Sequence, residues 1–459
     1  MEQITKPHCG ARLDCLPDCR WHSSMFAIVA FGLLVCWSNA VGGLILAQLK
    51  ALGWTDNSTT ATFSAITTAG MFLGALVGGI IGDKTGRRNA FILYEAIHIA
   101  SMVVGAFSPN MDFLIACRFV MGVGLGALLV TLFAGFTEYM PGRNRGTWSS
   151  RVSFIGNWSY PLCSLIAMGL TPLISAEWNW RVQLLIPAIL SLIATALAWR
   201  YFPESPRWLE SRGRYQEAEK VMRSIEEGVI RQTGKPLPPV VIADDGKAPQ
   251  AVPYSALLTG VLLKRVILGS CVLIAMNVVQ YTLINWLPTI FMTQGINLKD
   301  SIVLNTMSMF GAPFGIFIAM LVMDKIPRKT MGVGLLILIA VLGYIYSLQT
   351  SMLLITLIGF FLITFVYMYV CYASAVYVPE IWPTEAKLRG SGLANAVGRI
   401  SGIAAPYAVA VLLSSYGVTG VFILLGAVSI VVAIAIATIG IETKGVSVES
   451  LSIDAVANK

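Results

Sequence analysis

Long apolar blocks alternate with short polar segments along almost the whole chain. Blocks such as Met25 to Leu46, Val333 to Leu348 and Val418 to Ile439 approach the roughly 20 residues that a helix needs to cross the hydrocarbon core of a bilayer. These blocks are apolar on every face, whereas the strands of a membrane β-barrel alternate apolar with polar residues. The pattern therefore predicts an all-α integral membrane protein.

Twelve membrane-spanning helices fit this pattern, in two sets of six. The first set falls near residues 25–46, 62–82, 90–107, 112–137, 149–174 and 181–202, and the second near 265–292, 302–323, 331–348, 352–378, 390–413 and 417–440. A polar stretch between the sets predicts a partly helical cytoplasmic linker. The chain thus divides into an amino-terminal segment (1–24), a first half (25–202), the linker (203–264), a second half (265–440) and a tail (441–459).

Composition agrees with a membrane protein. Of the 459 residues, 56% are hydrophobic and only 12% are charged, whereas soluble domains carry about a quarter charged residues. The formal net charge of +8 does not point to nucleic acid, because Lys and Arg lie between the apolar blocks and form no basic patch. The polar residues before Met25 lack the features of a cleavable signal peptide, so we expect the first block to stay in the membrane.

The eight cysteines predict no disulfide framework. Most of them lie inside apolar blocks, where they pack as small hydrophobic residues. Near the amino terminus, His8, Cys9, Cys15, Cys19 and His22 do not have the spacing of a common zinc site, and reduced thiols are the simpler interpretation. We therefore expect no metal and no cofactor.

Lys and Arg in the short connections predict the orientation of the chain. Connections after even-numbered helices carry Lys84, Arg87, Arg88, Arg143, Arg145, Lys325, Arg328, Lys329, Lys387 and Arg389, whereas the other connections carry few. Short loops rich in Lys and Arg stay on the cytoplasmic side of a membrane. Both termini and the linker are then predicted to be cytoplasmic, in a multi-pass protein of the inner membrane.

The two halves also repeat at the level of sequence. Gly82 to Arg88, after the second helix, matches Met323 to Lys329, after the eighth. Glu138 to Pro141 resembles Glu380 to Pro383 in the same way, and Glu204 after the sixth helix corresponds to Glu442 after the twelfth. Two repeated membrane halves are the architecture of carriers that expose a central site alternately to each side. A channel or a receptor fits this plan less well.

At these residues the chain resembles the major facilitator superfamily, within its sugar-porter-like branch of bacterial metabolite–proton symporters and niacin and aromatic-acid carriers. The segments that carry the resemblance are Gly82 to Arg88, Arg118 to Gly126, Glu138 to Gly146, Pro203 to Leu209 and Pro379 to Gly390. The resemblance implies a twelve-helix fold whose halves are related by a pseudo-two-fold axis. Arg12 to Pro17 is similar to the amino-terminal segment of the metabolite symporters, which we expect to lie along the cytoplasmic surface.

Acidic and Arg residues at the loop ends of the helices predict a set of locks between conformations. Carboxylates and guanidiniums form strong, often bidentate hydrogen bonds that can also break. The predicted locking residues are Asp83, Arg87, Arg88, Glu138, Arg145, Glu204 and Arg207 in the first half, and Asp324, Arg328, Glu380, Arg389 and Glu442 in the second. We expect them to hold the outward-facing state; the alternative is that they only set topology and anchor helix ends.

Ionisable residues inside the predicted helices are the first candidates for a transport site, because burying a charge in a membrane is costly. Arg399 lies near the middle of the eleventh helix, in a segment that resembles the organic-anion carriers of eukaryotes and favours a carboxylate substrate. Arg118 is a second candidate for contact with the substrate, and Glu95 and His98 are candidates for proton coupling. The alternative for Arg399 is a hydrogen bond to helix carbonyls or to the other half.

Uncharged polar residues predict the rest of the site. Asn277, Tyr281 and Asn285 recur every four residues and so share one face of the seventh helix. That face can line a cavity, although such stripes also join membrane helices to one another. Further candidates for substrate binding are Asn39, Asn157 and Tyr372.

Positions at which this chain differs from the family reduce the range of expected substrates. The sugar carriers have paired glutamines where this chain has Ala275 and Met276, and a tryptophan where it has Ala375, so a hexose is disfavoured. Proton-coupled relatives also place an aspartate in the first helix, where this chain offers Asn39. Arg118 therefore lacks the partner that the resemblance implies, and a proton would have to bind Glu95 or His98.

The sequence accordingly predicts a secondary active transporter, acting as a monomer, that moves a small organic acid with protons by alternating access. An exporter or exchanger of drugs or metabolites, and a sensor that transports nothing, remain as alternatives. An enzyme is disfavoured, because no phosphate-binding loop, metal-ligand set or nucleophile motif is present.

Overall fold

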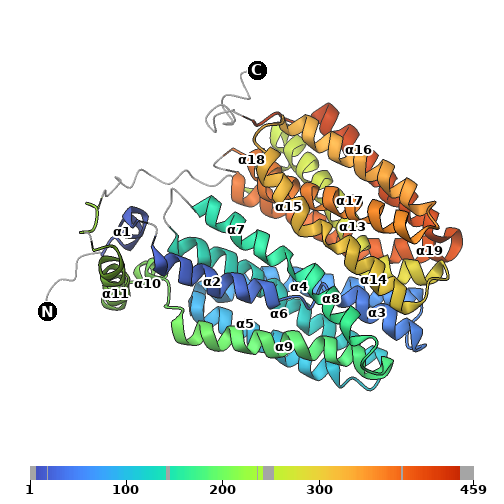
Figure 1. Cartoon of the computed structure of the whole chain (residues 1–459). Helices are drawn as coiled ribbons and strands as arrows, with labels where there is room; N and C mark the ends of the chain where they lie inside the picture. The colour runs from blue at the N-terminus through green and yellow to red at the C-terminus, as the bar shows by residue number, and fades with distance from the viewer. Residues whose placement is uncertain are drawn as a thin grey trace. The chain divides into compact units, whose positions relative to one another are not determined.

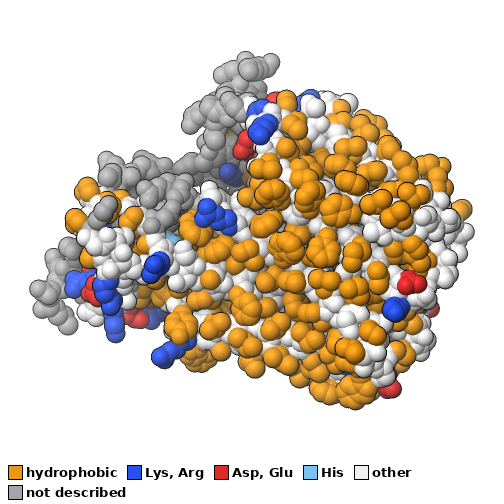
Figure 2. Space-filling view, in the orientation of Figure 1, with side chains coloured by type: hydrophobic (Ala, Val, Ile, Leu, Met, Phe, Trp, Pro, Cys, Tyr) orange, Lys and Arg blue, Asp and Glu red, His pale blue; other side chains and the backbone are white. Residues whose placement is uncertain are grey.

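Helices are the only regular secondary structure that the computed structural model contains in the residues it describes, which are 7–17, 19–140, 145–234, 236–240, 253–383 and 386–444. The side chains of residues 133, 134, 137, 145, 146 and 388 are not described. Figure 2 shows hydrophobic side chains over most of the visible helical surface, with few charged ones among them. Such a surface is the one expected of helices that face lipid.

Nine helical segments among the described residues are long and apolar enough to cross a membrane. Those formed by single helices are α4 (Asn57–Thr85), α5 (Arg87–Ala106), α6 (Met111–Tyr139), α9 (Ala176–Tyr201), α13 (Gly260–Thr293), α16 (Arg328–Ser347) and α19 (Lys387–Ile439). The other two combine α14 (Leu298–Met309) with α15 (Gly311–Val322), and α17 (Met352–Cys371) with the π-helix η2 (Tyr372–Tyr377) and α18 (Val378–Glu380). Figure 1 shows these elements as helices coloured by their place along the chain.

Interrupted helices account for the remaining predicted spans. The first predicted span is not continuous, because α2 (Arg20–Val35) and α3 (Gly42–Ala51) are separated by the non-helical residues 36–41. The fifth is divided in the same way into α7 (Arg145–Asn157) and α8 (Ser159–Leu170). Helix α19 holds the last two spans, which meet at Gly417, where φ is +64°. Helices thus occur in each of the twelve predicted segments, although only nine of the described helical segments qualify as spans by length and composition. The apolar pattern did not reveal the breaks in the first and the fifth.

The chain forms two compact units, and these do not coincide with the predicted halves. Unit 1 comprises residues 1–39, 70–159 and 184–246, whereas unit 2 comprises 40–69, 160–183 and 247–459. Unit 2 therefore contains α3, the first part of α4, most of α8 and the start of α9 together with every helix of the second half. Within it, Asn57 donates to Ser414 (2.9 Å) and Asn305 donates to Ser164 (3.1 Å). The ends of the first-half helices that lie away from the charged loops thus pack on the second half.

Small residues determine how closely the helices of unit 1 approach. Gly70, Gly74 and Gly78 recur every four residues along α4, and a Cβ at any of them would collide with α6. On α6, Gly124 lies against the backbone of His98 in α5. Such small residues let membrane helices pack backbone to backbone. Their consequence here is that α5 and α6 bring their buried polar side chains within reach of one another.

An amino-terminal clasp, formed by α1 (Cys9–Cys15), packs on α10 (Pro206–Ser211) and α11 (Tyr215–Thr233) of the linker (Figure 1). Cys9, Leu13 and Leu16 are buried in a cluster with residues of α10 and α11. Arg12 donates to both oxygens of Glu226, at 2.8 and 2.6 Å, and to Glu219 at 2.5 Å. The last helix of the linker is α12 (Tyr254–Leu257).

Replacing Arg12 by Ala is expected to loosen the clasp. Burial by itself raises the pKa of Glu219, but the hydrogen bonds from Arg12 and Arg223 hold that pKa below its ordinary value, so Arg12 is the partner of an ionised group. Loss of a charge-assisted contact costs on the order of 1–3 kcal/mol, which corresponds to an increase of about 5- to 150-fold in local opening. Alkylation of Cys9, followed by peptide mass spectrometry, measures that opening because the thiol is buried.

The matched control is Arg20→Ala, because the Arg20 side chain is exposed and lies outside the clasp. Its Cys9 should react as slowly as that of the unchanged protein. Equal reactivity of Cys9 in Arg12→Ala and in the unchanged protein would show that the ion pairs do not hold α1 in place.

Candidate functional site

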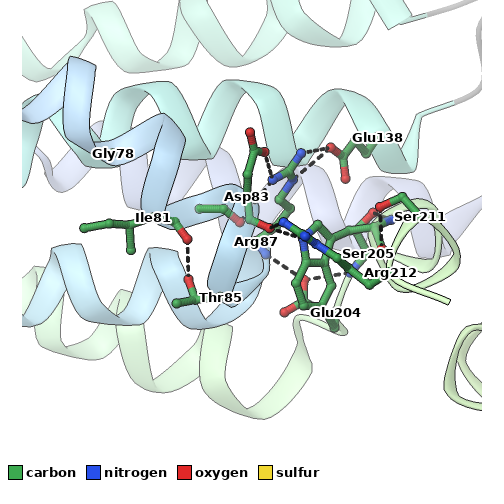
Figure 3. A network of polar contacts seen from close by, with 12 residues as sticks. Gly78, Ile81, Asp83, Thr85, Arg87, Glu138, Glu204, Ser205, Ser211 and Arg212 are labelled. Carbon is green, nitrogen blue, oxygen red and sulfur yellow. Dashed lines mark hydrogen bonds and ion pairs between the residues drawn. The ribbon is translucent and has the colours of Figure 1, made fainter. Parts of the chain in front are cut away.

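A charged network joins four elements of unit 1 at the ends of their helices (Figure 3). Arg87, the first residue of α5, donates from Nε to Glu138 of α6 (2.9 Å) and from Nη1 to Asp83 of α4 (2.7 Å). Its backbone N–H donates to Glu204 (2.7 Å), which follows α9. The indole of Trp208 in α10 donates to the carbonyl of Asp83 (2.7 Å). The linker is thereby tied to the same loop.

Unit 2 contains a network of the same design. Arg328, the first residue of α16, donates to both oxygens of Glu380 (3.1 Å each) and to Asp324 (3.1 Å). The backbone N–H groups of Arg328 and Lys329 donate to Glu442, at 2.8 and 3.1 Å. In both networks the Arg (Arg87 or Arg328) begins a helix and binds a Glu at the end of another helix (Glu138 or Glu380). A second Glu (Glu204 or Glu442) accepts from the first N–H groups of the helix that the Arg begins. The sequence repeat corresponds to a repeat of contacts.

Replacing Glu442 by Gln is expected to destabilise unit 2 by about 1–2 kcal/mol, because the first N–H groups of α16 lose a charged acceptor. Burial by itself raises the pKa of Glu442, but hydrogen bonds from the backbone of Arg328, Lys329 and Lys444 hold it below its ordinary value. A carboxylate with a lowered pKa contributes stability that is complete above its unfolded pKa, about 4.3, and is lost as the pH falls through the folded pKa.

Thermal unfolding in detergent micelles tests this expectation. The difference between Glu442→Gln and the unchanged protein should be full at pH 7 and should shrink below about pH 4. The control is Asp324→Asn, because the Asp324 side chain is 91% exposed and exposed ion pairs contribute little. A difference that does not depend on pH would argue against a charged cap.

Three of the remaining predicted locking residues make contacts within their own unit. Arg207 donates to the carbonyl of Glu138 (3.0 Å) and to Asp14 (2.8 Å) of the clasp, and Arg88 donates to the carbonyl of Trp199. The guanidinium of Arg389 lies 5.2 Å from the centre of the Tyr254 ring. The side chain of Arg145 lies outside the described residues. Because each of these contacts is internal to one unit, a locking role between conformations stays a prediction.

A buried polar cluster lies deep in unit 1, around the break between α2 and α3. Glu95, His98, Arg118 and Ser38 are all at most 1% exposed. His98 Nε2 is 2.7 Å from Ser38 Oγ, and His98 Nδ1 is 3.5 Å from Glu95 Oε2. Arg118 Nη1 donates to the backbone carbonyl of Ser38 (2.7 Å) and to the sulfur of Met121 (3.2 Å). The second oxygen of Glu95 is buried and has no hydrogen-bond partner among the described residues.

Ser38 is the member of this cluster that sequence reasoning missed. Asn39 was the residue expected to act in the first span, yet the contacts to His98 and Arg118 are made by its neighbour. Arg118, for which the first span offers no aspartate, donates instead to the carbonyl of Ser38. The available signal was a pair of polar residues inside an apolar block, followed closely by Gly42 and Gly43, which is where a membrane helix can break.

In unit 2, α13 and α19 pack closely and bring two residues of the predicted polar stripe against the segment of α19 that contains Arg399. A Cβ at Gly398 would lie 3.0 Å from the amide nitrogen of Asn277, and a Cβ at Gly402 would lie 3.1 Å from the ring of Tyr281. Arg399 follows Gly398 directly in α19. Its Nη1 is buried and has no hydrogen-bond partner in the described part of the chain. Among the positively charged groups of this unit, Arg399 is therefore one that can accept a bound anion.

The other predicted binding residues are not all in positions that favour contact with a substrate. Asn285 is buried where α13 faces Gly43 of α3, and Asn157 donates to the carbonyl of Ser153 in its own helix (2.8 Å). Tyr372 is fully buried, with its ring stacked 5.0 Å from that of Tyr377. That is the geometry of a packing residue, so Tyr372 is left out of the site proposed below.

No group of three or more His, Cys, Asp or Glu side chains comes close enough together to hold a metal ion within the described ranges. The polar clusters described above are built from carboxylate, imidazole, guanidinium and amide groups. Their chemistry is that of proton binding and of ion pairing with an anion.

Comparisons with known proteins agree with this architecture. The chain is 44% identical over 446 residues to the inner membrane metabolite transport protein YdjE of Escherichia coli, a match that covers 96% of this chain and 98% of YdjE. It is 26% identical over 448 residues to the niacin transporter NiaP of Acinetobacter baylyi, with 96% and 99% covered. A partially occluded, inward-open structure of the xylose transporter XylE from E. coli superimposes with a TM-score of 0.72, at 18% identity, over 93% of this chain and 100% of XylE.

These three relatives are membrane transporters and not enzymes. The family model of the major facilitator superfamily matches residues 26–406, which is most of the chain and includes both charged networks up to Glu380. These findings confirm the family and the fold predicted from the sequence. The chain belongs to the major facilitator superfamily, as a multi-pass secondary transporter.

Proposed function

We propose that this transporter carries a small organic acid together with protons, with the carboxylate bound by Arg399 and the proton bound by the pair Glu95 and His98. The observation that carries the proposal is the buried Nη1 of Arg399, which has no partner among the described residues. A guanidinium inside a membrane helix is costly unless a counter-charge or water satisfies it. A carboxylate supplies that charge and matches the planar donor geometry of Arg.

The surroundings of Arg399 support an anionic cargo with a polar or aromatic body. Asn277 and Tyr281 approach the same segment of α19, one helical turn apart. The amide nitrogen of Asn277 donates to the carbonyl of Leu273 in its own helix (2.7 Å), so Asn277 offers its carbonyl oxygen, and Tyr281 offers a hydroxyl and an aromatic face. The residues at the positions of the sugar-porter motifs, Ala275, Met276 and Ala375, offer a sugar no such hydrogen bonds.

The buried cluster of unit 1 supports proton coupling. An ionised carboxylate with a buried, unpartnered oxygen is costly, whereas a protonated Glu95 removes that cost. His98, next to it, can accept or donate a proton at either ring nitrogen. An anion that enters a cell with a negative interior also needs a co-transported cation to accumulate. Glu95 and His98 provide a place for that cation without an acid in the first span.

We infer that the charged loops and both termini lie in the cytoplasm, and that α3 and α13 close the opposite end of unit 2 and separate at another stage of alternating access. Support comes from unit 2, in which α3 packs against α13 at the end away from the charged loops. Both amide atoms of Gln48 in α3, and the hydroxyl of Thr289 in α13, are buried there without hydrogen-bond partners among the described residues. Buried orphan groups of this kind favour a closure that opens to water at another stage of the cycle.

Uptake into proteoliposomes with an imposed pH gradient tests the proposal. The probes are nicotinate and benzoate, each with its matched neutral amide, and xylose. Accumulation of a carboxylate but of neither amide, lost when the gradient is collapsed, is the expected result. Transport of xylose in preference to the acids would overturn the assignment of Arg399. Exchange of internal for external acid at a rate independent of the pH gradient would instead indicate that the protein is an exchanger.

A further inference from the structure

The break in the first span lies at the boundary between the two compact units. Helix α2 ends at Val35 in unit 1 and α3 begins at Gly42 in unit 2, and the chain passes from one unit to the other between Asn39 and Ala40. Ser38 is thus one of the last residues of unit 1 before the chain crosses. The chain passes between the units at five places, and among them this one falls in a non-helical break, where residues can absorb changes of φ and ψ as a hinge does.

Ser38 is bound to unit 1 at both its side chain and its backbone. Its hydroxyl is 2.7 Å from His98 Nε2, and its carbonyl accepts from Arg118 Nη1 at 2.7 Å. An ordinary structural role for a Ser at a helix break is to cap the next helix. Here the residue that precedes α3 is Val41, and that end of the helix has no side-chain cap. The hydroxyl of Ser38 is therefore committed to His98.

The bond between Ser38 and His98 depends on the protonation of the imidazole. When His98 is neutral with its proton on Nδ1, toward Glu95, Nε2 is an acceptor and the Ser38 hydroxyl donates to it. When His98 takes up a proton, Nε2 becomes a donor, the hydroxyl must accept, and its own hydrogen is free to turn elsewhere. One proton on His98 therefore reverses the hydrogen bond that holds the hinge.

We propose that Ser38 is a positioning residue that transmits the protonation of His98 to the hinge between α2 and α3. The inference rests on the proposed proton coupling and adds the route by which the proton acts on the conformation. Among the described residues of this cluster, the charged and titratable groups are Glu95, which faces His98, Arg118 from α6, which binds Ser38, and the thiol of Cys36, which lies near Glu95. Arg118 holds the carbonyl of Ser38 in both protonation states, whereas a proton on His98 reverses the bond at the hydroxyl and makes it charge-assisted.

Hydrogen–deuterium exchange of residues 36–41 tests the proposal on the full-length protein in detergent micelles, without any substrate. Exchange is measured at about pH 5 and about pH 8, the limits between which imidazoles change charge, and is expressed relative to the intrinsic rate at each pH. In the unchanged protein the protection of this segment should differ about five- to tenfold between the two conditions, the effect of exchanging a neutral hydrogen bond for a stronger, charge-assisted one.

Three variants make the test specific. Ser38→Ala keeps the carbonyl bond to Arg118 but removes the hydroxyl, and it should abolish the pH dependence; His98→Asn should do the same because its side chain does not titrate. Ser38→Thr is the matched control and should retain it, since the hydroxyl remains on Cβ. Equal thermal unfolding of the variants confirms that each has folded.

Protection that stays pH-dependent in Ser38→Ala, or that is independent of pH in the unchanged protein, would overturn the proposal. Loss of the dependence in Ser38→Thr would also overturn it, because the hydroxyl would then not be the deciding group. Failure of this experiment differs from failure of the proposed function: uptake of the acids is read in proteoliposomes, whereas exchange at the hinge requires no transported compound.

Discussion

Replacing Glu95 by Gln is expected to abolish the accumulation of organic acid driven by a pH gradient while leaving exchange of acid for acid intact. The side chain is fully buried, and one of its oxygens has no hydrogen-bond partner among the described residues. Under the proposed coupling, this carboxylate binds the transported proton and releases it during each cycle. Gln has nearly the same shape but never releases a proton, so it fixes the site in its neutral form.

The size of this effect follows from the driving force. A gradient of one pH unit corresponds to about 1.4 kcal/mol, or a tenfold accumulation for about one proton per acid. In Glu95→Gln the ratio of internal to external acid should fall to about one under the same gradient. The measurement compares gradient-driven uptake with counterflow in the same proteoliposomes.

The control is Glu177→Gln, because Glu177 is exposed in the first turn of α9 and its substitution also removes one carboxylate. It should accumulate the acid as the unchanged protein does. Gradient-driven accumulation that survives in Glu95→Gln would assign the proton to a different group, with His98 as the next to be changed.

Replacing Arg399 by Gln is expected to weaken the binding of a transported carboxylate by about 30- to 1000-fold, which corresponds to 2–4 kcal/mol for a charged, two-point contact. The buried Nη1 of Arg399 has no hydrogen-bond partner among the described residues. The substitution should therefore reduce the free energy of ligand binding and change the stability of the fold little. Arg399→Lys should be intermediate, because an ammonium keeps the charge but not the planar fork. The apparent affinity for the acid, from concentration-dependent uptake, gives the comparison.

Lys299→Gln serves as the control for charge, because Lys299 is exposed near the start of α14 and its substitution also removes one positive charge. Its affinity for the acid should be unchanged. Equal loss in Arg399→Gln and Lys299→Gln would indicate a general electrostatic effect, and undiminished affinity in both Arg399 variants would remove Arg399 from the binding site.

The features predicted best from the sequence are those set by local composition. An apolar segment of about 20 residues is stable as a membrane helix whatever its neighbours are, so the spans could be recognised from the sequence. The charged networks were found because both halves carry the same residues at the same helix ends, and Arg87 and Arg328 have corresponding contacts. A repeated motif of this kind can be read without knowledge of the packing.

The features that were missed depend on contacts between distant helices. Ser38 was overlooked because its role depends on the rotation of α5 and α6, which brings His98 to its hydroxyl and Arg118 to its carbonyl. Tyr372 was chosen by residue type, yet its hydroxyl faces Gly332 of α16. The boundaries of the compact units differ from those of the predicted halves because α3, from the first half, packs on α13 of the second. The hydropathy of a segment does not indicate which other apolar helix it will contact.

The central claim, that a carboxylate and a proton cross together, is tested most directly by recording the external pH while nicotinate enters proteoliposomes under a clamped membrane potential. Coupled entry predicts that the medium becomes more alkaline as the acid is taken up, by about one proton per carboxylate, and that Glu95→Gln removes this signal. Net uptake of the acid with no movement of protons would contradict the claim.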